Sequence, residues 1–346
     1  KQTYFPRLGV CYICINRSAR PSFLVWAGSL LGLVRLMTTS LKPYTSVAQQ
    51  IQLLTSRGMI VDEKLAAQWL LRVGYYRLSA YWYPYRVGSY EGRADEFEPE
   101  TSFEDVAQLY EFDRKFRTLL HDGIERIEVS LRTELIEAFR DADPLAYQKS
   151  ENFRPTFDHE EWLATVSRRV DRARRHSEAI RHYDQKYSGE LPIWVLTDVL
   201  DFSDLSRMYD ALPAKIQWTI AESLGIKINL SRLTPSQQSK VLKNHPLARW
   251  FEQLSIVRNT SAHHGRVWNR SYVPVSTVGF RTISKFEQLP VGQSEKMFGA
   301  LLVMGELISQ ISPGSTWRLK VEKLIEESFL PIHGRSITEM GFPNGS

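Results

Sequence analysis

The feature that most constrains the fold is an unbroken helical repeat of apolar residues between residues 103 and 139. Apolar side chains recur there every three or four residues, which places them along one face of an α-helix. The segment Thr101-Ser102-Phe103-Glu104 resembles a capping box that begins the helix, and Gly123 is a position at which it can bend. At 1.5 Å per residue such a helix is on the order of 55 Å long, so the rest of its domain has to pack against it.

The remaining sequence also shows mostly helical periodicity. Only residues 273–276 and 277–283 show strand-like alternation, and they can pair as one hairpin. The chain is therefore predicted to be all-α, a helical bundle with an N-terminal helical subdomain and at most one small β-hairpin. Further helices are predicted over residues 46–57, 62–73, 160–187, 193–199, 203–212, 215–224, 236–258 with a break at Pro246, 294–311 and 316–329.

The composition is that of a globular protein, with 346 residues, 43% apolar residues and 24% charged residues. The formal net charge of +5 suits a polyanionic partner such as nucleic acid. The two cysteines, Cys11 and Cys14, have no second pair at a spacing that would complete a zinc site. We interpret them as ordinary thiols of a reducing compartment rather than as a redox or metal motif.

The first forty residues differ from the rest. An apolar run from Phe23 to Val34 lies between Arg20 and Arg35 and is shorter than the ~20 residues that span a membrane. It resembles the core of a signal peptide, but no clear cleavage site follows. Because Met37 resembles an ordinary start, we expect residues 1–36 to be an upstream extension and the protein to be cytoplasmic, without a membrane association.

Four regions are predicted along the chain. They are an N-terminal extension (1–40), an N-terminal helical subdomain (41–100), the main helical domain (101–330) and a tail (331–346).

The segment from Ile256 to Arg266 carries the residues best suited to chemistry. Arg258 and His263 are separated by four residues, directly after an amphipathic helix. A histidine titrates near neutrality and can exchange protons with a ribose hydroxyl or a leaving oxygen. An arginine stays cationic and can hold the phosphate oxygens as charge builds up on them. The pair therefore suits cleavage of a phosphodiester, and this route requires no metal or other cofactor.

The spacing of this pair makes a structural prediction. On a straight helix two residues five apart differ by about 140° in direction, so Arg258 and His263 would not reach one phosphate. The side chains of Asn259, Thr260 and Ser261 compete for backbone hydrogen bonds. We therefore predict a kink or a new cap there, with Asn259 as the local cap. His264 is either a further polar group of the site or a helix-end residue, and we favour the site.

Two other arginine–histidine pairs occur in the sequence. Arg154 and His159 have the same spacing, but Pro155 and a predicted loop make this match accidental. Arg114 and His121 lie close to the same face of the long helix, where we expect a solvated polar stripe.

The densest basic segment contains Arg168, Arg172 and Arg175, which fall on one face of the helix predicted over residues 160–187. A solvated face is the more common role of such a segment, and binding of an RNA backbone is the alternative. The aromatic residues between Tyr75 and Tyr85 are expected to pack in the core, with Arg77 against carboxylates; stacking on bases is the alternative for them.

Several segments resemble the AbiD/AbiF-like part of the Abi family of abortive-infection proteins. The most specific is Arg258-Asn259-x-x-x-His263 followed by His264-Gly265-Arg266-x-Trp268-Asn269. Upstream, Gly74-Tyr75-Tyr76-Arg77-Leu78 and Leu109-Tyr110-Glu111-Phe112-Asp113-Arg114 agree with the same family. The resemblance covers residues 41 to about 270, with several motifs in the right order.

The resemblance implies a HEPN-like helical domain over residues 101–330, in which Arg258 and His263 are the catalytic pair of a metal-independent endoribonuclease. It implies a homodimer in which two such motifs face each other, and a role in defence against phages. From their positions beside the pair, we expect Asn259 and His264 to be supporting residues, Asn259 mainly as the local cap. RNA is then the substrate, a small associated RNA is a possible partner, and Arg168, Arg172, Arg175 and Arg266 are candidate RNA-binding residues. A non-catalytic RNA-binding regulator is the alternative.

Overall fold

The computed structural model describes residues 43–88, 92, 94–289, 292 and 294–343. The cysteine pair, the apolar run and Met37 all lie outside these residues. Thr45–Ser346 forms one compact unit, which contains every helix of the described chain.

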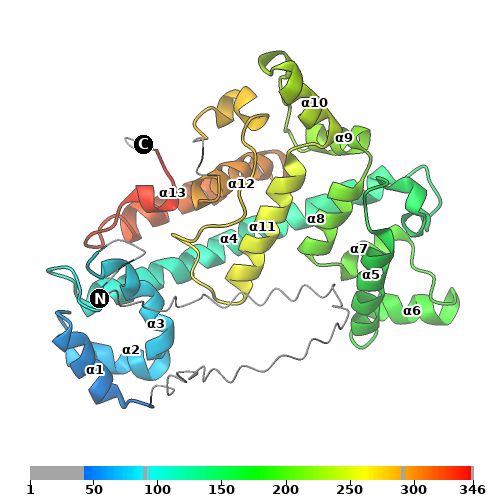
Figure 1. Cartoon of the computed structure of the whole chain (residues 1–346). Helices are drawn as coiled ribbons and strands as arrows, with labels where there is room; N and C mark the ends of the chain where they lie inside the picture. Colours follow the sequence, from blue (N-terminus) through cyan, green and yellow to red (C-terminus); the bar gives the residue numbers. More distant parts are fainter. Residues whose placement is uncertain (1–42, 89–91, 93, 290–291, 293, 344–346) are drawn as a thin grey trace, which may run out of the picture. The chain divides into compact units, whose positions relative to one another are not determined.

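The described part of the unit is all-helical, as predicted (Figure 1). Its α-helices are α1 (Val47–Ser56), α2 (Glu63–Arg72), α3 (Tyr75–Trp82), α4 (Phe103–Ala138), α5 (His159–Ala173), α6 (Glu178–Lys186), α7 (Ile193–Val199), α8 (Phe202–Ala211), α9 (Ala214–Ser223), α10 (Pro235–Lys243), α11 (Leu247–Ala262), α12 (Met297–Ile311) and α13 (Trp317–Ser328). Short 3-10 helices cover Tyr83–Tyr85, Ala146–Gln148, Ser150–Asn152, Leu230–Arg232, Phe280–Thr282, Ser284–Phe286 and Ile337–Met340.

The hairpin allowed for residues 273–283 does not form, and the described residues contain isolated bridges but no strand. The backbone of this segment bonds to other partners. The N–H of Tyr272 donates to the carbonyl of Glu295 at 2.8 Å, and that of Val275 donates to Ser294 Oγ at 3.0 Å. A 3-10 helix then begins at Phe280. The alternation of apolar residues therefore belongs to an extended segment held against the residues that precede α12.

Helix α4 is the 36-residue helix that the apolar repeat predicted, and it organises the fold. Its capping box pairs Ser102 with Asp105, one residue later than the predicted pair of Thr101 and Glu104. The helices α2, α3, α7, α8, α9, α11, α12 and α13 all contact it. Gly123 lies inside the helix, where a Cβ would come within 2.7 Å of both Met304 and Trp317. This glycine therefore lets α12 and α13 approach α4 closely.

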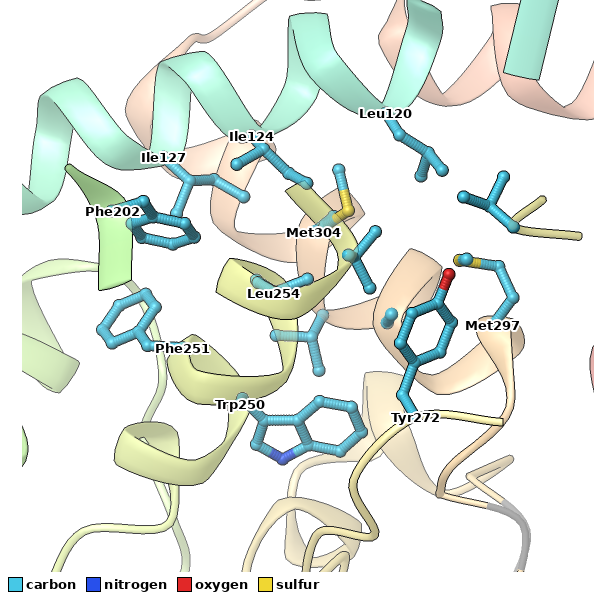
Figure 2. Close-up of a cluster of buried hydrophobic side chains, with 14 of the residues drawn as sticks. Leu120, Ile124, Ile127, Phe202, Trp250, Phe251, Leu254, Tyr272, Met297 and Met304 are labelled. Atoms are coloured by element: carbon cyan, nitrogen blue, oxygen red, sulfur yellow. The ribbon is translucent and has the colours of Figure 1, made fainter. Parts of the chain in front are cut away.

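The core lies where α4, α11 and α12 meet (Figure 2). Leu120, Ile124 and Ile127 of α4 point toward Leu254 of α11 and Met304 of α12, and all are buried. Each such side chain contributes about 1.5–3 kcal/mol through burial. Because α11 packs against both α4 and α8, its position relative to the long helix is determined over most of its length.

Two helix boundaries differ from the sequence prediction. The helix expected over residues 160–187 is two helices, because α5 ends at Ala173 and Ser177 caps the start of α6. The helix expected over residues 236–258 is broken near Pro246, as predicted, but its second part continues to Ala262.

Candidate functional site

Helix α11 runs without a break through the segment where a kink was expected. The N–H of His263 donates to the carbonyl of Asn259 at 3.0 Å, as a continuing helix requires. Thr260 donates its hydroxyl to the carbonyl of Ile256 at 2.8 Å, so the hydroxyl joins the helix instead of interrupting it. Thr260 and Ser261 are also buried, and tertiary packing therefore outweighs their local preferences. The predicted kink, and Asn259 as its cap, are wrong.

The helix ends one turn later, at His263 and His264. The N–H of Gly265 donates to the carbonyl of Thr260 at 2.8 Å, and that of His264 donates to the carbonyl of Ser261 at 3.0 Å. This is a Schellman motif, in which glycine normally occupies the left-handed position. Here the position is taken by His264, with φ of 57°. The left-handed conformation costs a residue other than glycine about 1–2 kcal/mol. The side chain of His264 is exposed here, beside the exposed His263.

Arg258 is half-buried on α11 and faces α4. Its Nε lies 3.8 Å from Glu128 Oε2, and its Nη1 donates to Asn259 Oδ1 at 3.2 Å. Glu128 is also bound by Arg132 at 2.6 Å, and Arg132 donates to the carbonyls of Thr197 and Leu200. These contacts orient the guanidinium of Arg258. Arg132 makes the shorter bond and is therefore the main partner of Glu128. Arg258 still has N–H donors with which it can bind another anion.

His121 of α4 lies near both Arg258 and His264. Its pKa is lowered by burial first, and then by the charges of Arg258 and His264, while Glu125 acts in the opposite direction. The sequence predicted that this histidine lies in a solvated stripe. The structure instead brings it to the end of α11. Its four-residue spacing from Arg117 places both residues on one face of the long helix, but it does not indicate which helix lies against that face.

A pocket of about 480 Å³ opens beside these residues, between α3, α4 and the end of α11. Its lining is rich in basic and hydroxyl side chains: Arg77, Tyr110, Arg114, Arg117, Thr118, His121, Ser261, Ala262 and His264.

Asp113 of α4 holds the loop that follows α11. Its Oδ1 accepts the N–H groups of Val267 at 3.1 Å and Trp268 at 3.0 Å. Its Oδ2 accepts the hydroxyl of Tyr81 at 2.8 Å and a bond from Arg117. Burial raises the pKa of the Asp113 carboxyl, and Arg117, Tyr81 and the two N–H groups oppose this.

The same loop is tied to α3. Arg77 donates to the carbonyl of His264 at 2.9 Å, and Arg266 donates to the carbonyl of Ala80. Arg77 is exposed and does not lie against carboxylates as predicted; Arg117 is the arginine that is buried against one. The three segments that suggested a family in the sequence, in α3, in α4 and after α11, therefore meet at one network.

The other candidates lie elsewhere. His159 is buried among aromatic rings with Nε2 2.8 Å from the carbonyl of Tyr147, and Arg154 pairs with Asp210 at 3.2 Å. This arrangement agrees with the interpretation of that pair as accidental.

Arg168 and Arg172 are exposed on α5, but Arg175 lies in the turn beyond its end. The three arginines therefore do not share one helical face, contrary to the prediction.

The aromatic segment mainly forms core, as expected. Tyr81, Trp82 and Tyr85 are buried, whereas Tyr76 is 91% exposed.

Within the described residues, no three histidine, cysteine or acidic side chains are grouped closely enough to bind a metal ion. No helix in the same part of the chain is both long and apolar enough to cross a membrane.

The fold and the site define a class: an all-helical protein in which a long central helix and a Schellman-capped helix bring arginines and histidines together over a buried Asp113–Arg117–Tyr81 network. The family model described as Abi-like protein matches residues 68–269, which is more than half of the chain. The chain therefore belongs to the Abi-like protein family, which confirms the resemblance seen in its sequence. This membership suggests a role in abortive infection, a defence against phages. No curated protein and no solved structure matches the chain.

Proposed function

We propose that this protein is a cytoplasmic, metal-independent endoribonuclease of phage defence, with a HEPN-like domain and with Arg258 and His263 as its catalytic pair. The observation that supports this most is the grouping of Arg258, His121 and His264 at the end of α11, beside the arginine-lined pocket. Cationic and titratable groups in this combination suit a phosphodiester.

In the proposed reaction a neutral imidazole removes the proton from a ribose 2′-hydroxyl. The 2′-oxygen attacks the adjacent phosphorus, the bond to the 5′-oxygen breaks, and a protonated imidazole supplies the proton to that leaving oxygen. Arg258 stabilises the charge on the non-bridging oxygens. The products carry a 2′,3′-cyclic phosphate and a 5′-hydroxyl.

A continuous α11 places Arg258 and His263 about 140° apart within one chain. We therefore propose that the active form is a homodimer in which Arg258 of one subunit acts with His263 of the other. Within one chain, His121 is an imidazole close enough to Arg258 for the guanidinium charge to lower its pKa. A lowered pKa keeps His121 neutral, as a general base has to be.

The test is incubation of the purified protein with labelled RNA in EDTA. The wild type is expected to release 2′,3′-cyclic phosphate ends, and Arg258→Ala and His263→Ala are expected to lower the rate by at least about a hundredfold. Arg318→Ala and His333→Ala serve as matched controls, because both residues are exposed and outside the site. Cleavage at the wild-type rate by both site variants contradicts the proposal.

The RNA is proposed to extend to Arg168, Arg172 and Arg175 near the end of α5. Arg169 and Arg174 beside them pair with aspartates, Arg169 with Asp204 and Arg174 with Asp184. Arg168 and Arg172 therefore contribute the exposed positive charge on α5. A small associated RNA can bind the same surface, and Arg266 remains a proposed RNA contact beyond its bond to Ala80.

A non-catalytic RNA-binding regulator is the second candidate, because the directions of Arg258 and His263 on α11 do not converge within one chain. It predicts salt-sensitive RNA binding without cleavage by the wild-type protein in the same assay.

A further inference from the structure

The pocket between α3, α4 and the end of α11 is separate from the proposed catalytic pair. Neither Arg258 nor His263 lines it. Its walls come from Arg77 on α3, from Arg114, Arg117 and His121 on α4, and from Ser261 on α11. Four elements of the described chain, counting the loop at His264, therefore contribute polar side chains to one small volume.

The charges of the three arginines are balanced to different extents. Arg117 is buried and neutralised by Asp113. Arg114 pairs with Glu111 at 2.9 Å, but both side chains are largely exposed, and such a pair contributes about 0–1 kcal/mol and exchanges easily with water. Arg77 makes no ion pair with any carboxylate of the described residues, and it donates instead to the carbonyl of His264. The pocket therefore has a surplus of positive charge at Arg77 and Arg114.

Ser261 adds an independent observation. It lines the pocket and is only 3% exposed, yet its hydroxyl has no hydrogen-bond partner. A buried hydroxyl without a partner costs about 1–3 kcal/mol. Because Ser261 lines the pocket, rotation about its Cβ–Oγ bond can direct the hydroxyl proton toward an acceptor bound there. A negatively charged oxygen is the strongest acceptor for such a donor.

We propose that this pocket is a phosphate-binding subsite, in which Arg77 and Arg114 bind the anion and the hydroxyl of Ser261 donates to it. The inference deepens the proposed function and rests on it for the identity of the ligand as RNA. The subsite holds a phosphate other than the scissile one and so fixes the position of the strand relative to Arg258.

The test uses a 2′-O-methyl RNA oligonucleotide, which lacks the nucleophile and cannot be cleaved by the proposed route. Binding is measured by fluorescence anisotropy at several salt concentrations. Arg77→Gln and Arg114→Gln are each expected to raise Kd by roughly tenfold and to reduce the salt slope by about one. Arg72→Gln, an exposed arginine at the end of α2 and outside the pocket, is the matched control and is expected to bind like the wild type.

Ser261→Ala separates binding from folding. Removal of an unpaired buried hydroxyl is expected to leave the free energy of unfolding unchanged or raised, whereas Kd is expected to rise several-fold. In NMR titrations of the wild type, sulfate is expected to raise the pKa of His121, because a bound anion stabilises its protonated form. Wild-type affinity in Arg77→Gln, Arg114→Gln and Ser261→Ala overturns the proposal.

The source of the phosphate is distinguished by a pair of oligonucleotides with and without a 5′-phosphate. If the wild type binds the phosphorylated strand more tightly and Arg77→Gln loses this preference, the pocket binds a terminal phosphate. If Arg77→Gln loses the same affinity for both strands, the pocket binds a phosphodiester within the chain. The binding assay measures no cleavage, so a binding loss in these variants stands even if the nuclease proposal fails. If the three variants bind RNA like the wild type and also cleave it normally in the separate EDTA assay, the subsite alone is rejected.

Discussion

Asp113 is fully buried, and both of its oxygens have partners on segments far away in the sequence. One oxygen binds the backbone after α11, and the other binds Tyr81 and Arg117. The carboxylate therefore fixes the loop that carries His264 to the first third of the long helix. A neutral residue here leaves the charge of Arg117 buried without its counter-ion.

Asp113→Asn is expected to lower the free energy of unfolding by about 3–5 kcal/mol, since one partner of a buried ion pair is removed. Asp122→Asn is a matched change on the same helix, where Asp122 pairs with Arg126 in an exposed bridge, and about 0–1 kcal/mol is expected. Urea unfolding of the three proteins measures this difference. Equal stabilities for the two variants would mean that the loop is held by other contacts.

His245 gives the fold a pH dependence. The residue is buried, its Nδ1 accepts the N–H of Leu247 at 3.2 Å, and burial lowers its pKa from 6.5 to about 3. The unfolded chain therefore binds a proton below pH 6.5 that the folded chain rejects. The stabilisation from the neutral ring is complete above pH 6.5 and is lost progressively as the pH falls toward 3.

We expect His245 to lower the free energy of unfolding of the wild type by about 2–3 kcal/mol when the pH falls from 7 to 4.5. Below pH 6.5, each pH unit contributes about 1.4 kcal/mol. His245→Asn keeps an acceptor for Leu247 but does not titrate, so its free energy of unfolding should fall less over the same range. Urea unfolding at both pH values measures the change. Parallel pH profiles for the two proteins would show that His245 does not cause it.

At the scale of elements, the sequence predicted α4 well because its boundaries depend on local signals. Its apolar repeat lies on one buried face, and Ser102 caps its first turn. The end of α11 was not predictable in this way. Asn259 and Ser261 favour a break locally, but burial of Thr260 and Ser261 against neighbouring helices keeps the helix intact. Packing between elements far apart in sequence decides such a case.

The candidate site shows the same division. Arg258 and His264 were found from their own segment, whereas His121 and Arg77 join them through the crossing of α11 with α4 and the bonding of α3 to the loop. A single sequence contains no signal for that crossing. The spacing along one helix therefore identified the site residues at the end of α11, but not the residues of α3 and α4 that lie opposite them.

Gly123 tests how closely α4 packs against α12 and α13. Gly123→Ala is expected to destabilise the protein by about 1–3 kcal/mol, because its Cβ would lie 2.7 Å from Trp317 Nε1, which donates to the carbonyl of Leu119. Gly305→Ala on α12 has no atom within 4 Å of the new Cβ and should gain about 0.5–1 kcal/mol from helix propensity. Thermal unfolding compares the two, and a stabilised Gly123→Ala would refute the close packing.

At the scale of the whole molecule, one chain presents Arg258 beside α4 and His263 at the exposed end of α11. The ion pair with Glu128 and the bond to Asn259 hold the arginine where it is. Bringing the two side chains together within the chain would require unwinding the buried turn at Thr260 and Ser261. In the proposed homodimer a second copy would supply the missing direction without any such change, because a two-fold symmetric interface that contains the motif brings its two copies face to face.

This dimer makes a prediction that a single-chain site does not. Arg258→Ala and His263→Ala proteins are each expected to be inactive, but after mixing and subunit exchange they should regain roughly a quarter of the wild-type RNA cleavage. About half of the dimers are then mixed, and each mixed dimer keeps one site with an intact arginine from one subunit and an intact histidine from the other.

The control mixture combines Arg258→Ala with the double variant Arg258→Ala/His263→Ala, which cannot form an intact site in any pairing. If the two single variants stay inactive when mixed, although native mass spectrometry shows that they exchange subunits, Arg258 and His263 do not act across the interface. The continuous α11 would then have to rearrange in each chain for the pair to meet, and hydrogen exchange at Thr260 and Ser261 on RNA binding would reveal that unwinding.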